Sequence, residues 1–156
     1  MPYLIDGHNL IPHISGINLS DLDDEIKLIQ SLHIFANKRR SKIEVYFDQA
    51  HTGQSHSQNH GLLKAVFVQQ ESTADNAIKS RLSQLGKGAR NWTVVSSDRE
   101  IRVEARSCRS KVLTSPEFAK LLRDQLSEIQ KEGEDTDSPD QSNLEVDYWM
   151  DQFSQD

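Results

Sequence analysis

Four aspartates stand where a catalytic or metal-binding site could form, namely Asp6, Asp48, Asp75 and Asp98. Asp6, Asp48 and Asp98 come at the ends of apolar runs of strand length, and Asp75 stands at the start of a helical pattern. The carboxyl ends of parallel strands meet at one edge of a sheet, so we expect these side chains to converge. Crowded carboxylates repel one another and raise one another's pKa, and such sites usually hold a divalent cation. Mg²⁺ and Mn²⁺ prefer oxygen ligands and can activate water for phosphodiester hydrolysis.

Each aspartate also has a purely local interpretation. Asp75 is a favourable acid for a first helical turn, Asp98 is a good N-cap, and Asp48 is a common turn residue after a strand. Asp6 is the hardest to explain locally, because it directly ends a buried strand. The recurrence of all four at one predicted edge favours a metal site. Further polar side chains could orient ligands or waters there: Asn9, Thr73, Ser96 and Ser97.

Alternating strand and helix patterns position these residues. The predicted strands are residues 2–5, 43–47, 63–68, 92–96 and 111–113, and residues 49–61 read as a polar loop. The predicted helices are residues 20–40, 74–85, 99–107 and 115–129, the last with Ser115 as N-cap and Pro116 at its first position. This order predicts an α/β fold in three layers, with a central parallel sheet of about five strands and helices on both faces.

Composition limits the classes of protein that fit. The single cysteine, Cys108, excludes an internal disulfide and suggests a reducing compartment, and no apolar run is long enough for a membrane span, so we expect a cytoplasmic protein. Residues 127–156 hold ten of the 24 acids but one of the 18 bases, which leaves the body at +3 and this segment at −9. A nucleic-acid partner for the body is therefore allowed.

Several other chemistries fit the sequence less well. There is no P-loop motif and no glycine-rich dinucleotide motif after the first strand. A haloacid-dehalogenase-type phosphatase would have a second Asp two residues after Asp6, where this chain has His8. A receiver-like signalling domain, with Asp48 as phosphoacceptor, would have an acidic pair after the first strand, which this chain lacks. The spacing of His51, His56 and His60 matches no zinc pattern, so we interpret them as residues of a substrate-facing loop.

The motifs Asp6-Gly-His-Asn9, Phe47-Asp48, Ser72-Thr-Ala-Asp75 and Ser96-Ser-Asp98 together resemble the NYN domain of the PIN-like nuclease superfamily, in its YacP-like branch. The resemblance covers about residues 1–126. It implies a PIN-like (Rossmannoid) domain that cuts RNA with Mg²⁺ or Mn²⁺, with Asp6, Asp48, Asp75 and Asp98 as metal-binding acids and Asn9 as companion of Asp6. The resemblance to this branch also implies mRNA on the ribosome as one target.

We therefore predict a metal-dependent endoribonuclease at residues 1–130. The alternative is a catalytically inactive RNA- or protein-binding module on the same fold. The residues expected to contact RNA are Lys38, Arg39, Arg40, Arg99 and Arg102, the last two best placed because they follow Asp98.

The C-terminal segment has two predicted parts. Residues 131–143 are acidic and lack large apolar residues, so we predict a disordered linker. Residues 144–156 interleave acids with Tyr148, Trp149 and Phe153, which is typical of a short docking helix or of a peptide that folds on a partner. This tail could bind a protein or mask the basic face, and both a monomer and a homodimer are compatible with the sequence.

Overall fold

The computed structural model describes residues 1–14, 22–48, 56–69 and 73–134 of the 156-residue chain. The strands are β1 (Tyr3–Asp6), β2 (Ile43–Phe47), β3 (His56–His60), β4 (Leu63–Phe67), β5 (Thr93–Val95) and β6 (Lys111–Leu113). The α-helices are α1 (Gly7–Leu10), α2 (Leu22–Arg39), α3 (Ala74–Leu85), α4 (Arg99–Ser107) and α5 (Ser115–Glu134), and the 3₁₀ segments are η1 (Ile11–His13) and η2 (Gly86–Asn91).

The strands form one sheet in the order β3-β4-β2-β1-β5-β6. All neighbours are parallel except β3 and β4, which form an antiparallel hairpin. In the central strand β1, Tyr3 lies opposite Ile43 on one side and Thr93 on the other. Every residue of β1 and β2 is buried, as expected for parallel strands covered on both faces.

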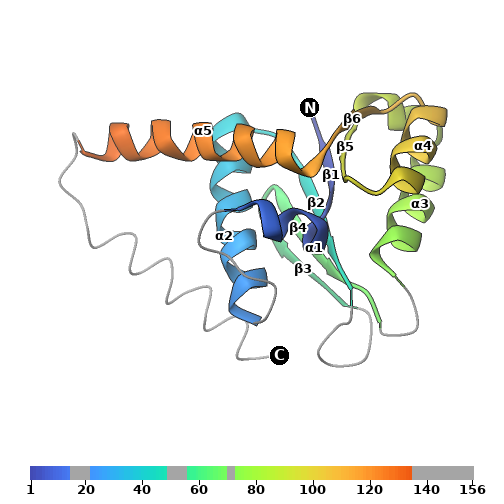
Figure 1. Ribbon diagram of the computed structural model, residues 1–156, viewed down its shortest axis with the longest axis horizontal. Helices are drawn as coiled ribbons and strands as arrows, with labels where there is room; N and C mark the ends of the chain where they lie inside the picture. Colours follow the sequence, from blue (N-terminus) through green and yellow to red (C-terminus); the bar gives the residue numbers. More distant parts are fainter. Residues whose placement is uncertain (15–21, 49–55, 70–72, 135–156) are drawn as a thin grey trace.

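Helices cover both faces of the sheet, which confirms the predicted α/β architecture (Figure 1). One face packs on α1, α2 and α5 through a core that includes Phe35, Phe47 and Phe118. The other packs on α3 and α4 through a second core that includes Ile78, Trp92 and Ile101. The two helical layers place the starts of α1, α3 and α4 at the carboxyl edge of the sheet.

The structure differs from the sequence prediction at one edge of the sheet. Residues 56–60, predicted as part of a polar loop, form the sixth strand, β3. Gly61, with φ of +65°, turns the chain into β4, and only glycine adopts this conformation without strain. The ring of His56 stacks on Phe67 at 4.8 Å between centroids, and His60 is buried at the other end of β3. His51 lies outside the described residues.

Two further predictions concern the C-terminal segment and membrane-spanning helices. Helix α5 continues to Glu134, into the range predicted as a linker, and residues 135–156 lie outside the described part of the chain. Within the described residues, none of the helices combines the length and the apolar character that a membrane span requires.

Candidate functional site at the carboxyl edge of the sheet

Asp6 is fixed by the turn from β1 into α1. It is 6% exposed and serves as N-cap of α1, with its Oδ1 accepting a hydrogen bond from the Asn9 backbone N–H at 3.4 Å. A Cβ on Gly7 would lie 2.4 Å from Cε1 of Phe47, the last residue of β2. The turn therefore needs glycine, because the chain leaves β1 directly against the neighbouring strand.

The carboxyl group of Asp6 is unusual in its acidity. Burial, together with the negative charges of Asp75 and Asp48, raises its pKa from 3.8 to about 6. The Asn9 amide and His8 oppose this shift without cancelling it. Asp6 is thus held in a place that disfavours its ionised form, and a bound cation would relieve this cost.

Asp48 joins β2 to α3. It follows the last residue of β2, and its Oδ1 accepts a hydrogen bond from the backbone N–H of Ala74, the first residue of α3. The N-cap of α3 is Thr73, whose Oγ1 accepts from the Asn76 N–H at 3.1 Å. Asp75 is therefore not required for capping, and its side chain faces the other acids.

Asp98 and Asp75 form a close pair. Burial, the charges of Asp98 and Asp48, and a hydrogen bond to the Asp98 side chain all raise the pKa of Asp75. Asp98 is at the same time the N-cap of α4, with its Oδ1 accepting from the N–H groups of Glu100 at 2.8 Å and Ile101 at 3.3 Å. Asp98 therefore both caps α4 and interacts with Asp75, which is possible because a carboxylate has two oxygens.

Asn9 connects α1 with the loops after β5 and β6. Its Oδ1 accepts hydrogen bonds from the Ser97 backbone N–H at 2.8 Å and from the Ser115 hydroxyl. The Ser97 hydroxyl in turn accepts from the Ser115 N–H at 3.1 Å. Asn9 and these two serines thus hold the carboxyl ends of β1, β5 and β6 in a fixed relation.

The role of Ser115 differs from the sequence prediction. Helix α5 begins at Ser115 itself, and the Thr114 hydroxyl accepts from the Glu117 N–H at 3.3 Å in the capping position. The prediction of Ser115 as N-cap was wrong by one residue. Its side chain is fully buried and turned toward Asn9 instead, which no local pattern indicates.

A histidine–glutamate pair lies beside the acids, and sequence reasoning missed its glutamate. His8 Nε2 is 3.2 Å from Glu25 Oε1 of α2, and the His8 ring meets Phe47 edge-on at 5.3 Å. Burial lowers the pKa of His8, but the Glu25 hydrogen bond and the charges of Glu25, Asp48 and Asp6 outweigh it and raise the pKa above 6.5. Glu25 directly precedes buried Ile26 in α2 and is itself buried. Acids are seldom buried unless they are paired, so an acid at such a position indicates a partner.

The predicted RNA-binding residues lie at two different edges of the sheet. Arg99 and Arg102 are in the first turns of α4, directly after Asp98, with Arg99 exposed and Arg102 half-buried. Lys38 and Arg39 end α2 and Arg40 follows them, just before β2 begins, at the amino edge of the parallel strands. The structure therefore brings only the first pair near the acidic cluster.

The four aspartates offer the oxygen ligands that a divalent cation such as Mg²⁺ prefers, but they do not form a closed set of ligands around one point. Among the described residues, no three His, Cys, Asp or Glu side chains lie close enough together to hold an ion between them. The side chains of Asp75 and Asp98 are within hydrogen-bonding reach of each other, and Asp6 and Asp75 interact electrostatically. Mg²⁺ typically binds one or two carboxylates and retains several waters, so two of these aspartates would supply enough protein ligands.

The chain thus combines a mainly parallel α/β sheet with carboxylates at the carboxyl ends of β1, β2 and β5 and at the start of α3, the arrangement expected of a PIN-like domain. Comparison with known proteins then gives the family. The family model of the YacP-like NYN domain matches residues 3–155, so the chain belongs to this nuclease-type family. The match extends beyond residues 1–126, to which the sequence resemblance was assigned.

Two solved structures share the fold. The crystal structure of Rae1 (YacP) from Bacillus subtilis is 17% identical with a TM-score of 0.70, covering 99% of this chain and 92% of that one. The W164L mutant of the same protein gives 22% identity and a TM-score of 0.69, over 93% of this chain and 89% of that one. A comparison with the sequences of curated proteins gave no match.

Proposed function

We propose that this protein is a metal-dependent endoribonuclease that hydrolyses RNA phosphodiester bonds at the acidic cluster, with mRNA on the ribosome among its substrates. The observation that carries the proposal is electrostatic: burial and neighbouring carboxylates raise the pKa of Asp6 to about 6, and burial and the Asp98 carboxylate raise that of Asp75. Carboxylates destabilised in this way by the fold, in a family of nuclease type, are best explained by a ligand that compensates their charge.

Asp6, Asp48, Asp75 and Asp98 would hold Mg²⁺ or Mn²⁺ at this edge. When bound, such an ion lowers the pKa of water and neutralises charge on a phosphate. The chain's own groups fix the geometry: backbone N–H groups hold Oδ1 of Asp6, Asp48 and Asp98, so the second oxygen of each would serve as the ligand. Arg99 and Arg102 follow directly and supply positive charge for RNA phosphates.

The test is a cleavage assay on single-stranded and structured RNAs and on ribosome-bound mRNA, with Mg²⁺, Mn²⁺ or EDTA. The variant Asp75→Asn with Asp98→Asn removes the closest pair of charges and keeps side-chain size, and Asp124→Asn, an exposed residue of α5, is the control. We expect metal-dependent cleavage that falls by roughly 100-fold or more in the double variant and is unchanged in the control.

A second readout does not depend on catalysis. Mn²⁺ should raise the melting temperature of the wild type and leave that of the double variant unchanged, because a ligand stabilises only a folded state that binds it. RNA binding without cleavage in any form, and without a Mn²⁺ effect, would favour the alternative, a non-catalytic RNA-binding module. The observation in favour of that alternative is that the described acids do not form a closed three-ligand site.

A further inference from the structure

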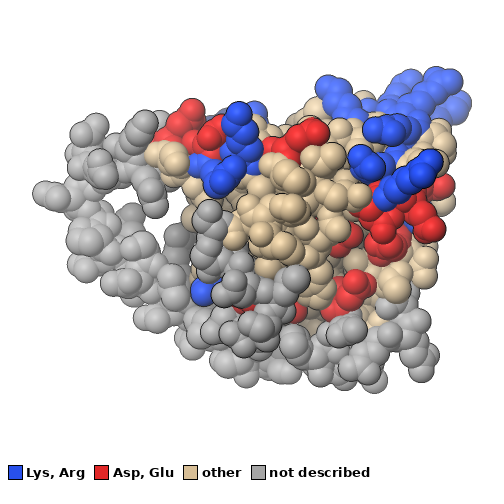
Figure 2. Space-filling model, in the orientation of Figure 1, with Lys and Arg blue, Asp and Glu red and all other residues tan. Residues whose placement is uncertain are grey.

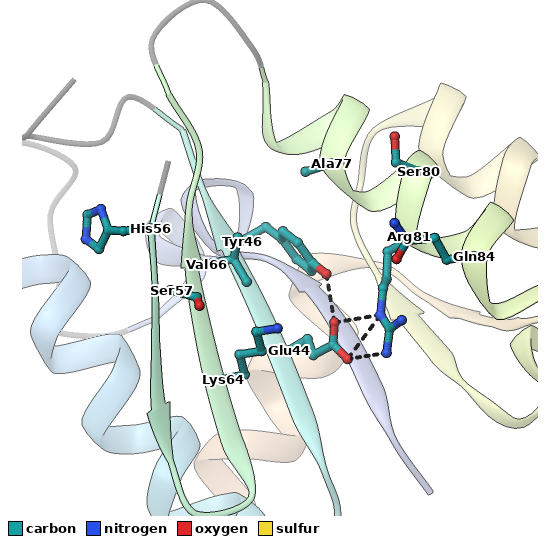
Figure 3. Close-up of a pocket in the computed structure, with 10 residues that line it drawn as sticks. All are labelled: Glu44, Tyr46, His56, Ser57, Lys64, Val66, Ala77, Ser80, Arg81 and Gln84. Atoms are coloured by element: carbon teal, nitrogen blue, oxygen red, sulfur yellow. Dashed lines mark hydrogen bonds and ion pairs between the residues drawn. The ribbon is translucent and has the colours of Figure 1, made fainter. Parts of the chain in front are cut away.

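A groove lies on the sheet face that α3 and α4 cover. Helix α3 packs against β1 and β2 and α4 against β6, whereas the β3–β4 hairpin extends the sheet beyond α3. The groove between α3 and the hairpin has a volume of about 490 Å³, within the range of small-ligand sites (Figure 3). Ser57 of β3, the strand that the sequence pattern did not predict, forms part of its lining.

Alternate residues of three strands form the floor. Glu44 of β2 lies opposite Lys64 of β4, and Tyr46 lies opposite Val66, which faces Ser57 of β3 on its other side. Alternation along each strand places these side chains on the same face of the sheet. The wall is a single face of α3, at the helical spacing of Ala77, Ser80, Arg81 and Gln84.

The charge of the groove is positive despite the buried acid in its floor. Glu44 is 3% exposed, and Arg81 donates to both of its oxygens, from Nε at 2.9 and 3.2 Å and from Nη2 at 2.9 Å (Figure 3). The Tyr46 hydroxyl also donates to Glu44, at 2.7 Å. Glu44 is thus compensated, whereas Lys64 forms no ion pair with a carboxylate of the described ranges.

The groove and the acidic cluster are formed in part by the same elements, β2 and α3. Tyr46 of the floor lies in β2 two residues before Asp48, which directly follows that strand. Ala77 of the wall lies two residues after Asp75 on α3. The end of the groove formed by Tyr46 and Ala77 therefore opens toward the carboxyl edge of the sheet. A polymer that reaches the acids along this face would pass Tyr46 and Ala77 first.

We propose that this groove binds the single-stranded RNA segment that flanks the scissile bond. The inference rests on the proposed function, because it takes the acidic cluster as the place of cleavage. Lys64 would meet a phosphate, and the side chains of Ser57, Ser80 and Gln84 offer hydrogen bonds to a sugar or base. Val66, which is half-buried, gives the apolar surface for an unstacked base, and the buried Tyr46 ring supports it from below. Lys64, as the uncompensated charge in the groove, favours an anionic chain over an acid-rich or neutral peptide.

The first experiment compares charge at matched positions on the same elements. Ser80→Glu places a negative charge in the groove, and Ser83→Glu places the same charge on the same helix at an exposed serine outside it. Lys64→Glu is paired in the same way with Lys42→Glu, an exposed lysine just before β2. Affinity for a fluorescein-labelled 12-nucleotide single-stranded RNA is measured with the full chain in EDTA, so binding is read without cleavage.

We expect the two groove variants to raise the Kd about five-fold or more and the two controls to raise it less than about two-fold. Each groove variant and its control change the net charge by the same amount, so a difference between them reports the position of the charge. A second measurement uses the wild type, so it does not depend on the folding of any variant. RNA containing 4-thiouridine is crosslinked to the protein, and the modified peptides should come from residues 57–66 or 77–84. Crosslinks confined to other segments would overturn the groove assignment, as would equal Kd values for Ser80→Glu and Ser83→Glu.

The outcomes separate this inference from the proposed function. Unchanged binding in the groove variants, together with metal-dependent cleavage by the wild type, would overturn the groove and leave the nuclease intact. Weakened binding in the groove variants without cleavage by the wild type would support the groove and overturn the nuclease. Failure of the wild type to bind any RNA would overturn both.

Discussion

At the residue scale, the acidity of Asp6 makes the stability of the protein depend on pH. Its pKa in the folded chain is raised to about 6, above the usual 3.8, mainly because the carboxyl group is buried. The folded state therefore binds the proton more tightly than the unfolded state does. Stability from this group is fully present below pH 4 and is lost as the pH rises through about 6, to a total of up to about 3 kcal/mol.

Substitution of Asp6→Asn should stabilise the protein at pH 8 in EDTA, by about 1–3 kcal/mol, and should have little effect at pH 4. Asparagine retains the N-cap of α1, so the loss of charge is the main change. Urea unfolding at pH 4, 6 and 8 measures the difference, with Asp124→Asn on exposed α5 as the control. A destabilisation that is equal at all three pH values would contradict the assigned cause.

The sequence was sufficient to place the four aspartates at one edge of the sheet, while their role as metal ligands stays a prediction. Each stands next to a strongly apolar strand or a capped helix, and such local patterns place a residue at a sheet edge without knowledge of the packing. Glu25 could not be assigned in the same way, because its partner His8 belongs to another element and only the packing of α2 on α1 brings them together.

At the scale of elements, α1 is oriented by the contact of Gly7 with Phe47. The Phe47 ring stacks on Phe67 and meets His8, so it has little room to move. The passage from β1 to α1, and with it the position of Asp6, depends on this close approach.

We expect Gly7→Ala to destabilise the protein by about 1–3 kcal/mol, because the added methyl group overlaps the Phe47 ring. The second substitution Phe47→Leu should be less harmful in the Gly7→Ala background than in the wild type, since it removes the overlap. A double-mutant cycle in urea unfolding measures this coupling. Strict additivity of the two changes would show that the contact does not orient α1.

The strand that sequence reasoning missed is β3, and it also missed three short segments, α1, η1 and η2. The residues of β3 are polar, and they lack the β-branched and apolar types that indicate a strand. What holds β3 in the sheet is its pairing with β4 and the stacking of His56 on Phe67, both of which are properties of the hairpin as a whole. Gly61 before an apolar run was the available sign of the turn.

At the scale of the whole molecule, positive and negative side chains gather in separate regions of the surface. Figure 2 shows Lys and Arg concentrated over α4 and the neighbouring end of the sheet, next to a region of acids on the same side. Exposed bases from η2, α4, β6 and the turn between α4 and β6 belong to this part of the chain: Lys87, Arg90, Arg99, Arg106, Arg109 and Lys111. Arg99 lies beside Asp98 at the carboxyl edge, whereas the other five lie toward the amino edge of the parallel strands, away from the acidic cluster. This positive field can therefore attract RNA to the molecule without itself marking the place of cleavage.

The salt dependence of RNA binding should distinguish the two predicted basic groups. Arg99→Ala with Arg102→Ala should reduce the slope of log K against log salt by about 1.4, the value for two phosphate contacts with a single strand. Lys38→Ala with Arg40→Ala, two charges at the amino edge, should change it by less than half as much. The opposite order would place the RNA path along the amino edge of the sheet.

The position of β1 in the middle of the sheet governs how the chain can fold during synthesis. Tyr3 pairs with Ile43 on one side and with Thr93 on the other, so the first strand to leave the ribosome is completed by one of the last. Such non-local pairing slows folding. Until β5 has emerged, β1 has a partner on one side only, and its apolar residues remain available to chaperones or to another nascent chain. Rare codons after Val95 would prolong this exposure less than rare codons before Thr93.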